Sequence, residues 1–167
     1  EEAPFAELLE GLAGWQVTHL VHPEAETAVA RGAAGHADAI LVDSTDIVGF
    51  ATSLFTADFF DRARAILGPG GAFVTLSESL HFHFEMVREV QKTLASVFPH
   101  VDLYTAPLAT YGGNWWCFAV GTNGLELRAP VREPVTPTRY YCGDIHRSAF
   151  LPAFLYRRLM EAGRTGF

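Results

Sequence analysis

The chain has 167 residues, of which 49% are apolar and 19% charged, so it can form one packed core and is not a disordered polar chain. Its formal net charge of −7 argues against nucleic acid as a partner, because phosphate contacts need a basic face. An acidic balance is compatible with a cationic ligand, although acidity more often serves solubility. No apolar run reaches the roughly 18–20 residues of a membrane-spanning helix, so we expect no membrane span.

The cysteines and the start of the chain bear on its compartment. Cys117 and Cys142 form no closely spaced pair, which favours a reducing compartment over a secretory one. The chain begins at Glu1 with neither a secretory signal nor a basic transit peptide. We therefore expect a cytoplasmic protein, with an organelle as the alternative if the chain belongs to a larger complex.

Apolar periodicity and turn residues predict strands that alternate with helices. This alternation is typical of an α/β sheet with parallel strands and right-handed crossovers. The apolar run 37–42 is typical of a strand buried on both faces, and residues 68–71 predict a turn. The expected helices are 2–12, 24–31, 56–67, 83–98 and 149–162, and the expected strands are 16–21, 37–42, 72–76, 101–104 and 116–121. The hydroxyl of Thr56 can cap the helix 56–67.

Two carboxylates follow the most apolar predicted strand. Ligands of open α/β sheets bind beyond the carboxyl ends of the strands, and Asp43 ends the run 37–42 at that edge. Asp46 lies three residues further on. The pair could hold an ammonium group and later accept its proton. The alternative is that Asp43 caps the loop and Asp46 is solvated.

Two further features lie at the same predicted edge. Glu78 follows the next strand, where it is either a ligand-binding carboxylate or a group that stabilises the N-terminus of the following helix. Tyr111 precedes two glycines and a pair of tryptophans, a pattern that could form a loop over a ligand, since aromatic faces attract cations. Aromatic residues next to glycine are, however, more often core or turn residues.

We expect no metal site. His81 and His83 have a suitable spacing for two ligands on a strand, but no third ligand lies nearby in the sequence. A pair of histidines at the start of a helix is the better interpretation. Residues 68–71 follow a helix and not a strand, so they do not form a phosphate-binding loop. Cys117 lies in an apolar run and is expected to be a small buried residue.

These features, in this order, resemble the spermidine synthase family of polyamine aminopropyltransferases. The resemblance is strongest over residues 37–156. It implies a Rossmann-like, class I methyltransferase-like α/β fold with the strand order 3-2-1-4-5-7-6. The chain 1–167 is then a single partial domain, the C-terminal half of the family's catalytic domain, without its N-terminal β-domain and first strands. The matching stretches are A-I-L-V-D-S-T-D from Ala39, S-L-F-T-A-D-F-F from Ser53, L-G-P-G-G-A-F-V from Leu67, V-F-P-H from Val97, A-P-L-A-T-Y from Ala106 and R-Y-Y-C-G-D-I-H-R-S-A-F from Arg139.

The resemblance also implies an activity. The family transfers an aminopropyl group from decarboxylated S-adenosylmethionine to putrescine. By resemblance, Asp43 is the proton acceptor of the D-S-[ST]-D motif and Asp46 holds the diamine. Tyr111 hydrogen-bonds the amine, and Glu78 occupies the family's acidic position after the following strand.

The departures from the family pattern leave alternatives open. Ile47 replaces the gate proline and Leu76 replaces a glutamine, while the glycine-rich G-G-G-D-G loop is missing. We therefore expect that this chain alone binds no cofactor and is inactive, and that decarboxylated S-adenosylmethionine is a co-substrate only together with a missing half. One alternative is an inactive family member that serves as a structural or interaction subunit, and another is a methyltransferase-like domain with a different ligand. The expected partners are putrescine, if the protein is active, and either further copies of the chain or a larger assembly.

Overall fold

The computed structural model describes residues 24–32, 35, 37–43, 49–111, 115–130, 134, 138–161, 163 and 166. The predicted helix 2–12 and strand 16–21 lie outside these residues. In the described part, no helix has the length and apolar character needed to cross a membrane. The helices are α2 (Glu24–Arg31), α3 (Ala57–Ile66), α4 (Phe84–Ala95), α5 (Gly143–Ala149) and α6 (Ala153–Met160), with the short 3-10 helices η1 (Gly49–Phe55) and η2 (Ala109–Tyr111). The strands are β1 (Ala37–Val42), β2 (Leu67–Ser79), β3 (His100–Pro107) and β4 (Trp115–Thr122).

The four strands form one sheet in the order β1-β2-β4-β3. This order matches the last four positions of the order that the resemblance implies. The prediction of parallel strands is wrong for β4, which runs antiparallel to both β2 and β3, whereas β1 and β2 are parallel. The reason is the connection between β3 and β4. It comprises residues 108–114, too few for the crossover of a dozen or more residues that a parallel pair requires.

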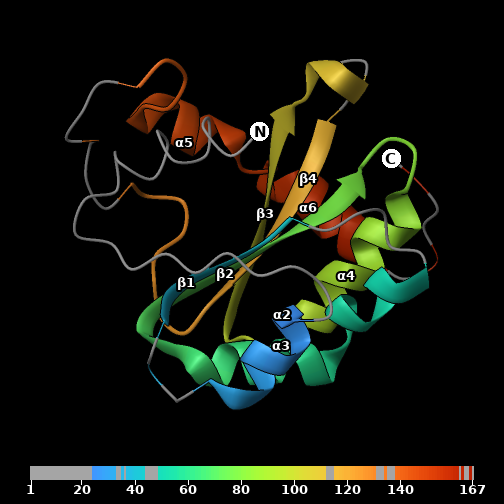
Figure 1. Ribbon diagram of the computed structural model, residues 1–167. Helices are drawn as coiled ribbons and strands as arrows, with labels where there is room; N and C mark the ends of the chain where they lie inside the picture. The colour runs from blue at the N-terminus through green and yellow to red at the C-terminus, as the bar shows by residue number, and fades with distance from the viewer. Residues whose placement is uncertain are drawn as a thin grey trace.

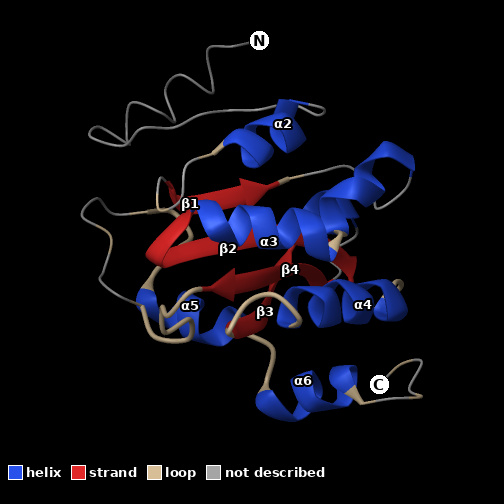
Figure 2. Cartoon of the chain, turned by 90° about the horizontal axis from the view of Figure 1, so that it is seen from below, coloured by secondary structure: helices blue, strands red, loops and turns tan. Residues whose placement is uncertain are grey.

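The main core lies between the sheet and the helices that follow its strands. Figure 1 shows α2, α3 and α4 on one side of the sheet and α5 on the other, and Figure 2 shows the same layers from below. Phe73 of β2 packs edge-on against Phe60 of α3, with ring centroids 5.2 Å apart, and stacks on Phe98 at 5.8 Å. Both Phe60 and Phe73 are fully buried. Aromatic packing thus fixes the helical layer on β2.

Helix ends follow their sequence signals at α3 but not at the C-terminus. The backbone N–H of Phe59 donates to the Thr56 hydroxyl, so Thr56 caps α3 as predicted. The prediction of one helix over 149–162 is wrong, because α5 ends at Ala149 and α6 begins after Pro152. Proline has no N–H for a helical hydrogen bond but fits a helix start, so the chain breaks there into two helices.

Two expectations for β1 and β2 are also corrected. β1 is not buried on both faces, since each of its residues is exposed or half-buried and Leu41 is 75% exposed. Within the described residues β2 is its only strand neighbour, so no described strand pairs with its outer edge. Residues 68–71 do not end the helix as a separate turn. They form a bulge within β2, because Leu67 pairs with Ala37 and Ala72 already pairs with Ala39.

Candidate functional site

The sheet brings three of the predicted site residues to its carboxyl edge. Val42 of β1 pairs with Thr75 of β2, so the chain after β1 and the chain after β2 leave the sheet on the same side. Trp116 of β4 pairs with both Ser79 and Ala106, which places the segment after β3 on that side as well. Asp43 and Tyr111 lie on the segments after β1 and β3, and Glu78 is the penultimate residue of β2. Asp46 lies outside the described residues.

Asp43 and Glu78 occupy different environments at this edge. Asp43 directly follows β1 and is exposed, so its carboxylate can exchange a proton with solvent or with a ligand. Glu78 is only 3% exposed. Tyr111 is the last residue of η2, and only its backbone is among the parts that the structure describes. The roles predicted for these three residues and for Asp46 therefore stay predictions.

Glu78 has an unusual backbone and a histidine partner. Its φ is +75°, and it is the only non-glycine residue with a positive φ among those described. Such a conformation costs energy for a residue with a Cβ and marks a site where the surroundings impose it. The Nδ1 atom of His83 lies 3.6 Å from Oε2 of Glu78. No signal in the sequence predicts this conformation or this contact.

The paired tryptophans are divided between the surface and the core. Trp115 is 51% exposed, whereas Trp116 is buried. The backbone N–H of Leu80 donates to the carbonyl oxygen of Trp115 at 3.1 Å, which ties the turn after β2 to the start of β4. Phe82, in that turn, is 66% exposed. The carboxyl edge therefore carries exposed aromatic side chains as well as carboxylates.

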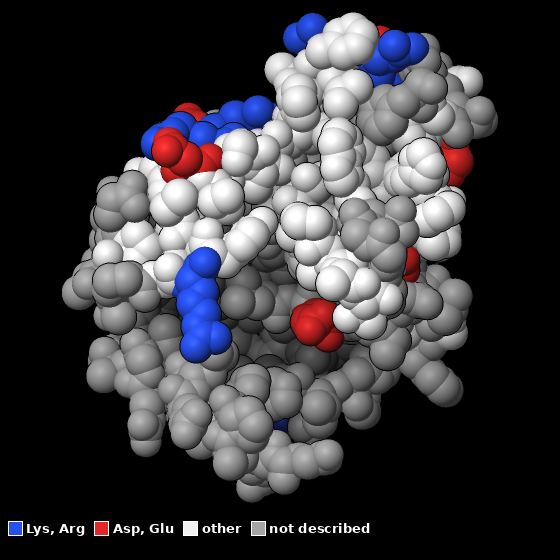
Figure 3. Space-filling view, turned by 90° about the horizontal axis from the view of Figure 1, so that it is seen from above, with Lys and Arg blue, Asp and Glu red and all other residues white. Residues whose placement is uncertain are grey.

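The end of the molecule toward which β3 points in Figure 1 is viewed directly in Figure 3. Its described surface carries one basic and one acidic group on opposite sides of its centre, with uncharged residues above them.

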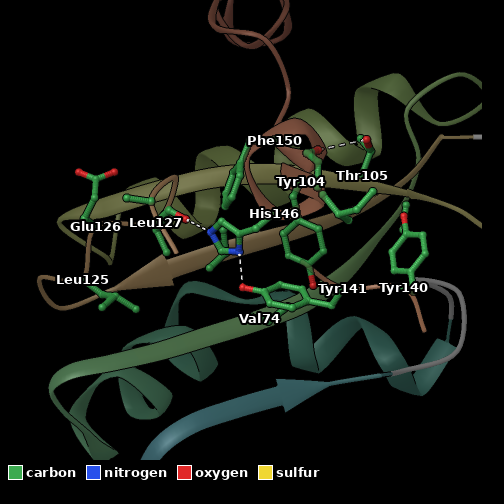
Figure 4. Close-up of a pocket in the computed structure, with 15 residues that line it drawn as sticks. Val74, Tyr104, Thr105, Leu125, Glu126, Leu127, Tyr140, Tyr141, His146 and Phe150 are labelled. Carbon is green, nitrogen blue, oxygen red and sulfur yellow. Dashed lines mark hydrogen bonds between the residues drawn. The ribbon is translucent and has the colours of Figure 1, made fainter. Parts of the chain in front are cut away.

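A cavity of about 520 Å³ lies on the sheet face opposite the helical core. Val74 lines it, and side chains alternate along a strand, so Val74 faces away from the side on which Phe73 packs. Neither Asp43 nor Glu78 lines this cavity. Sequence reasoning missed it, although the closing motif from Arg139 supplies much of its wall. Its aromatic lining consists of Tyr104, Tyr140, Tyr141, His146 and Phe150 (Figure 4).

His146 holds the cavity wall together. Its Nε2 lies 2.9 Å from the carbonyl oxygen of Leu127, which can only accept, so Nε2 carries the proton. In the neutral ring Nδ1 then accepts from the hydroxyl of Tyr141 at 3.1 Å (Figure 4). Burial raises the pKa of Tyr104, which keeps its phenol protonated. These are interactions within the wall, and they do not form a nucleophile with its base.

Metal chemistry has no support in the described part of the chain. No group of three or more His, Cys, Asp or Glu residues gathers there in a way that could hold an ion. His83 contacts a carboxylate at 3.6 Å, and His81 packs edge-on against Phe82 with centroids 5.3 Å apart.

Comparison with known proteins finds polyamine aminopropyltransferases among the relatives of this chain. The chain is 45% identical over 124 residues to polyamine aminopropyltransferase 1 of Aquifex aeolicus, which covers 74% of this chain and 44% of that protein. It is 45% identical, with the same coverage, to the polyamine aminopropyltransferase of Hydrogenobaculum and 37% identical to that of Bacillus subtilis over 71% of this chain and 44% of that one. The chain thus spans less than half the length of these relatives.

The fold agrees with solved structures. A spermidine synthase in complex with the transition-state analogue AdoDATO matches 95% of this chain and 57% of its own, with a TM-score of 0.71 at 23% identity. The spermidine synthase of Thermotoga maritima matches 93% of this chain and 54% of its own, with a TM-score of 0.69 at 19% identity. Residues 17–128 match the family model described as the spermine/spermidine synthase domain. The chain belongs to the spermine/spermidine synthase family.

Proposed function

We propose that this chain forms the amine-binding side of an aminopropyltransferase that converts putrescine with decarboxylated S-adenosylmethionine. The observation that carries the proposal is the arrangement of the carboxyl edge. Asp43 opens the family's D-S-T-D motif directly after β1, and Glu78 lies one residue before the end of the adjacent parallel strand β2. Two carboxylates on neighbouring strand ends suit a substrate with two ammonium groups, because opposite charges attract.

The reaction needs a base at this edge. A protonated amine has no lone pair, so one proton must leave before nitrogen attacks the carbon beside the sulfonium. A nitrogen–carbon bond then forms and the carbon–sulfur bond breaks. The electron pair of the broken bond stays on the sulfur, which departs as a neutral thioether. Asp43 accepts the amine proton, and its exposure lets it pass that proton to solvent. General-base catalysis of this kind contributes about 10²–10⁴-fold to the rate.

The remaining residues have positioning roles in this proposal. Asp46 holds the far ammonium group of the diamine, Glu78 lies at the near end, and Tyr111 hydrogen-bonds the amine. Alignment of the two reactants contributes a further large factor, because it removes the entropy cost of bringing them together. The sulfonium co-substrate is held by residues that lie outside the amine-binding edge. Assembly with further copies or with other subunits, and a cytoplasmic location, stay predictions.

The experiment is a turnover assay of the intact protein with its Asp43→Asn variant. Asparagine keeps the shape of the side chain but cannot accept the proton. We expect kcat to fall by about 10²–10⁴-fold, with no change in the melting temperature. Asp38→Asn is the matched control, because Asp38 is an exposed carboxylate near the opposite end of the same strand.

The outcomes separate the proposal from its alternative. Unchanged transfer in Asp43→Asn would show that Asp43 is not the base. If the intact protein showed no aminopropyl transfer, the alternative of an inactive structural subunit would be favoured. The replacement of the family glutamine by Leu76 is consistent with that alternative.

A further inference from the structure

The turn that follows β2 fixes the backbone of His83. The backbone N–H of His83 donates to the carbonyl oxygen of Ser79 at 2.8 Å, and the N–H of Val87 donates to the carbonyl oxygen of His83 at 3.0 Å. The first bond closes the turn and the second begins α4. Both the N–H and the carbonyl group of His83 are therefore hydrogen-bonded, which fixes the backbone from which its ring extends toward Glu78.

Burial of the Glu78 carboxylate requires partners. Its side chain is 4% exposed, and an ionised carboxylate removed from water is costly unless it is paired. Nδ1 of His83 lies 3.6 Å from Oε2 and supplies one such contact. The imidazole itself is 48% exposed, so the pair extends from the buried strand end to the surface of the carboxyl edge.

The ring of His83 is not needed to cap the helix. His83 is the N-cap residue of α4, but its side chain makes no capping hydrogen bond. The interaction that the structure gives to the imidazole is the one with Glu78. A side chain that lies at a helix start without capping it, and beside a carboxylate in a strained backbone, points to a role at that carboxylate.

We propose that His83 is a positioning residue that orients the Glu78 carboxylate toward the amine substrate. The inference rests on the proposed function, since it assigns the near end of the diamine to Glu78. A carboxylate has two oxygens and about four acceptor positions, so contact with His83 is compatible with contact to an ammonium group. The strained backbone of Glu78 determines the position of its side chain, and the contact with His83 determines the orientation of its carboxylate.

The test measures putrescine binding by calorimetry and transfer kinetics in the intact protein. His83→Ala is expected to weaken putrescine binding and raise its KM by about two- to fivefold, the size expected for the loss of one half-exposed polar contact. The value of kcat should change less than about twofold, because the base and the reacting atoms are untouched. His83→Gln keeps a hydrogen-bond donor and should restore most of the affinity.

His81→Ala is the matched control. His81 is an exposed histidine two residues away that contacts Phe82. It should leave both binding and KM unchanged, and thermal unfolding should show that all three variants fold. Equal putrescine affinity in wild type and His83→Ala would overturn the inference, as would equal losses in His81→Ala and His83→Ala. If the wild-type protein bound no diamine, the proposed function would fail as well, which distinguishes the two results.

Discussion

The two outer strands of the described sheet are built in opposite ways. At β3, the N–H of Leu151 donates to the carbonyl oxygen of Leu103 at 2.9 Å, and Phe150 forms a bridge with Tyr104. The returning chain therefore closes that edge. At β1, Leu41 is 75% exposed, and the described residues provide no strand on its outer side.

A charged clamp reinforces the closed edge. Arg128 binds the carboxylate of Asp102 through two nitrogen–oxygen contacts of 2.6 and 2.8 Å. The same guanidinium donates to the carbonyl oxygen of Leu151 at 3.0 Å and lies over the ring of Phe150. The comparison teaches that stabilising contacts concentrate at β3, while the candidate chemistry lies at the carboxyl ends of β1 and β2. Changes at the two edges should therefore have different consequences.

Removing the charged clamp tests most directly whether the β3 edge is the more stabilised one. Arg128→Met keeps much of the apolar stem but leaves Asp102, which is 8% exposed, without its guanidinium. We expect the free energy of unfolding to fall by about 3 kcal/mol, the lower end of the range for breaking a buried ion pair, because Arg128 itself stays 42% exposed. Denaturant unfolding measures this change.

Arg147→Met is the control for that variant. Arg147 pairs with Asp144 at 2.8 Å, but both side chains are largely exposed, so the loss should stay below about 1 kcal/mol. Similar losses in the two variants would contradict the view that the β3 edge is the stabilised one.

A second prediction concerns the centre of the sheet and its dependence on pH. Burial raises the pKa of the Cys117 thiol to about 12, and burial likewise raises the pKa of Tyr104 and Tyr156. Between about pH 9 and 12 the unfolded thiol is ionised while the folded one keeps its proton, so unfolding releases a proton. Stability is therefore full below pH 9 and falls above it, by up to about 1.4 kcal/mol per pH unit for one group.

Unfolding at a series of pH values tests this prediction. Cys117→Ala should show a shallower loss of stability above pH 9 than wild type, whereas the exposed Cys142 should leave the slope unchanged when replaced by alanine. Identical slopes in all three proteins would show that Cys117 is accessible to solvent.

The smallest effect is expected at the open edge. Leu41→Gln replaces a side chain that is already 75% exposed, so the free energy of unfolding should change by no more than about 0.5 kcal/mol. The matched change at the closed edge is Leu103→Ala, which removes a fully buried side chain and should cost about 2–5 kcal/mol. A large loss in Leu41→Gln would mean that β1 is covered in the intact protein.

Sequence reasoning predicted those elements whose signals are local. The bounds of α2 and β1 match their predictions, and the cap at Thr56 is confirmed, because helical spacing, a strand-like apolar run and a capping hydroxyl all act within a few residues. The direction of β4 depends on the length of its connection to β3, and the break before α6 depends on Pro152. Both signals are visible in the sequence but compete with apolar periodicity.

The candidate site was predictable only as a set of residues at one edge. The parallel pairing of β1 and β2 confirms that Asp43 and Glu78 share the carboxyl edge. The left-handed backbone of Glu78 and its contact with His83 depend on how the turn after β2 packs, which no residue pattern encodes. The pairing of Asp102 with Arg128 joins two distant segments, so it has no periodicity to reveal it.

The closure of β3 has a consequence for synthesis on the ribosome. The strand is complete at Pro107, but the residues that close its outer edge, Phe150 and Leu151, are translated only after the whole of α5. At about 5–20 residues per second the nascent chain therefore spends several seconds with β3 open to pairing with other strands.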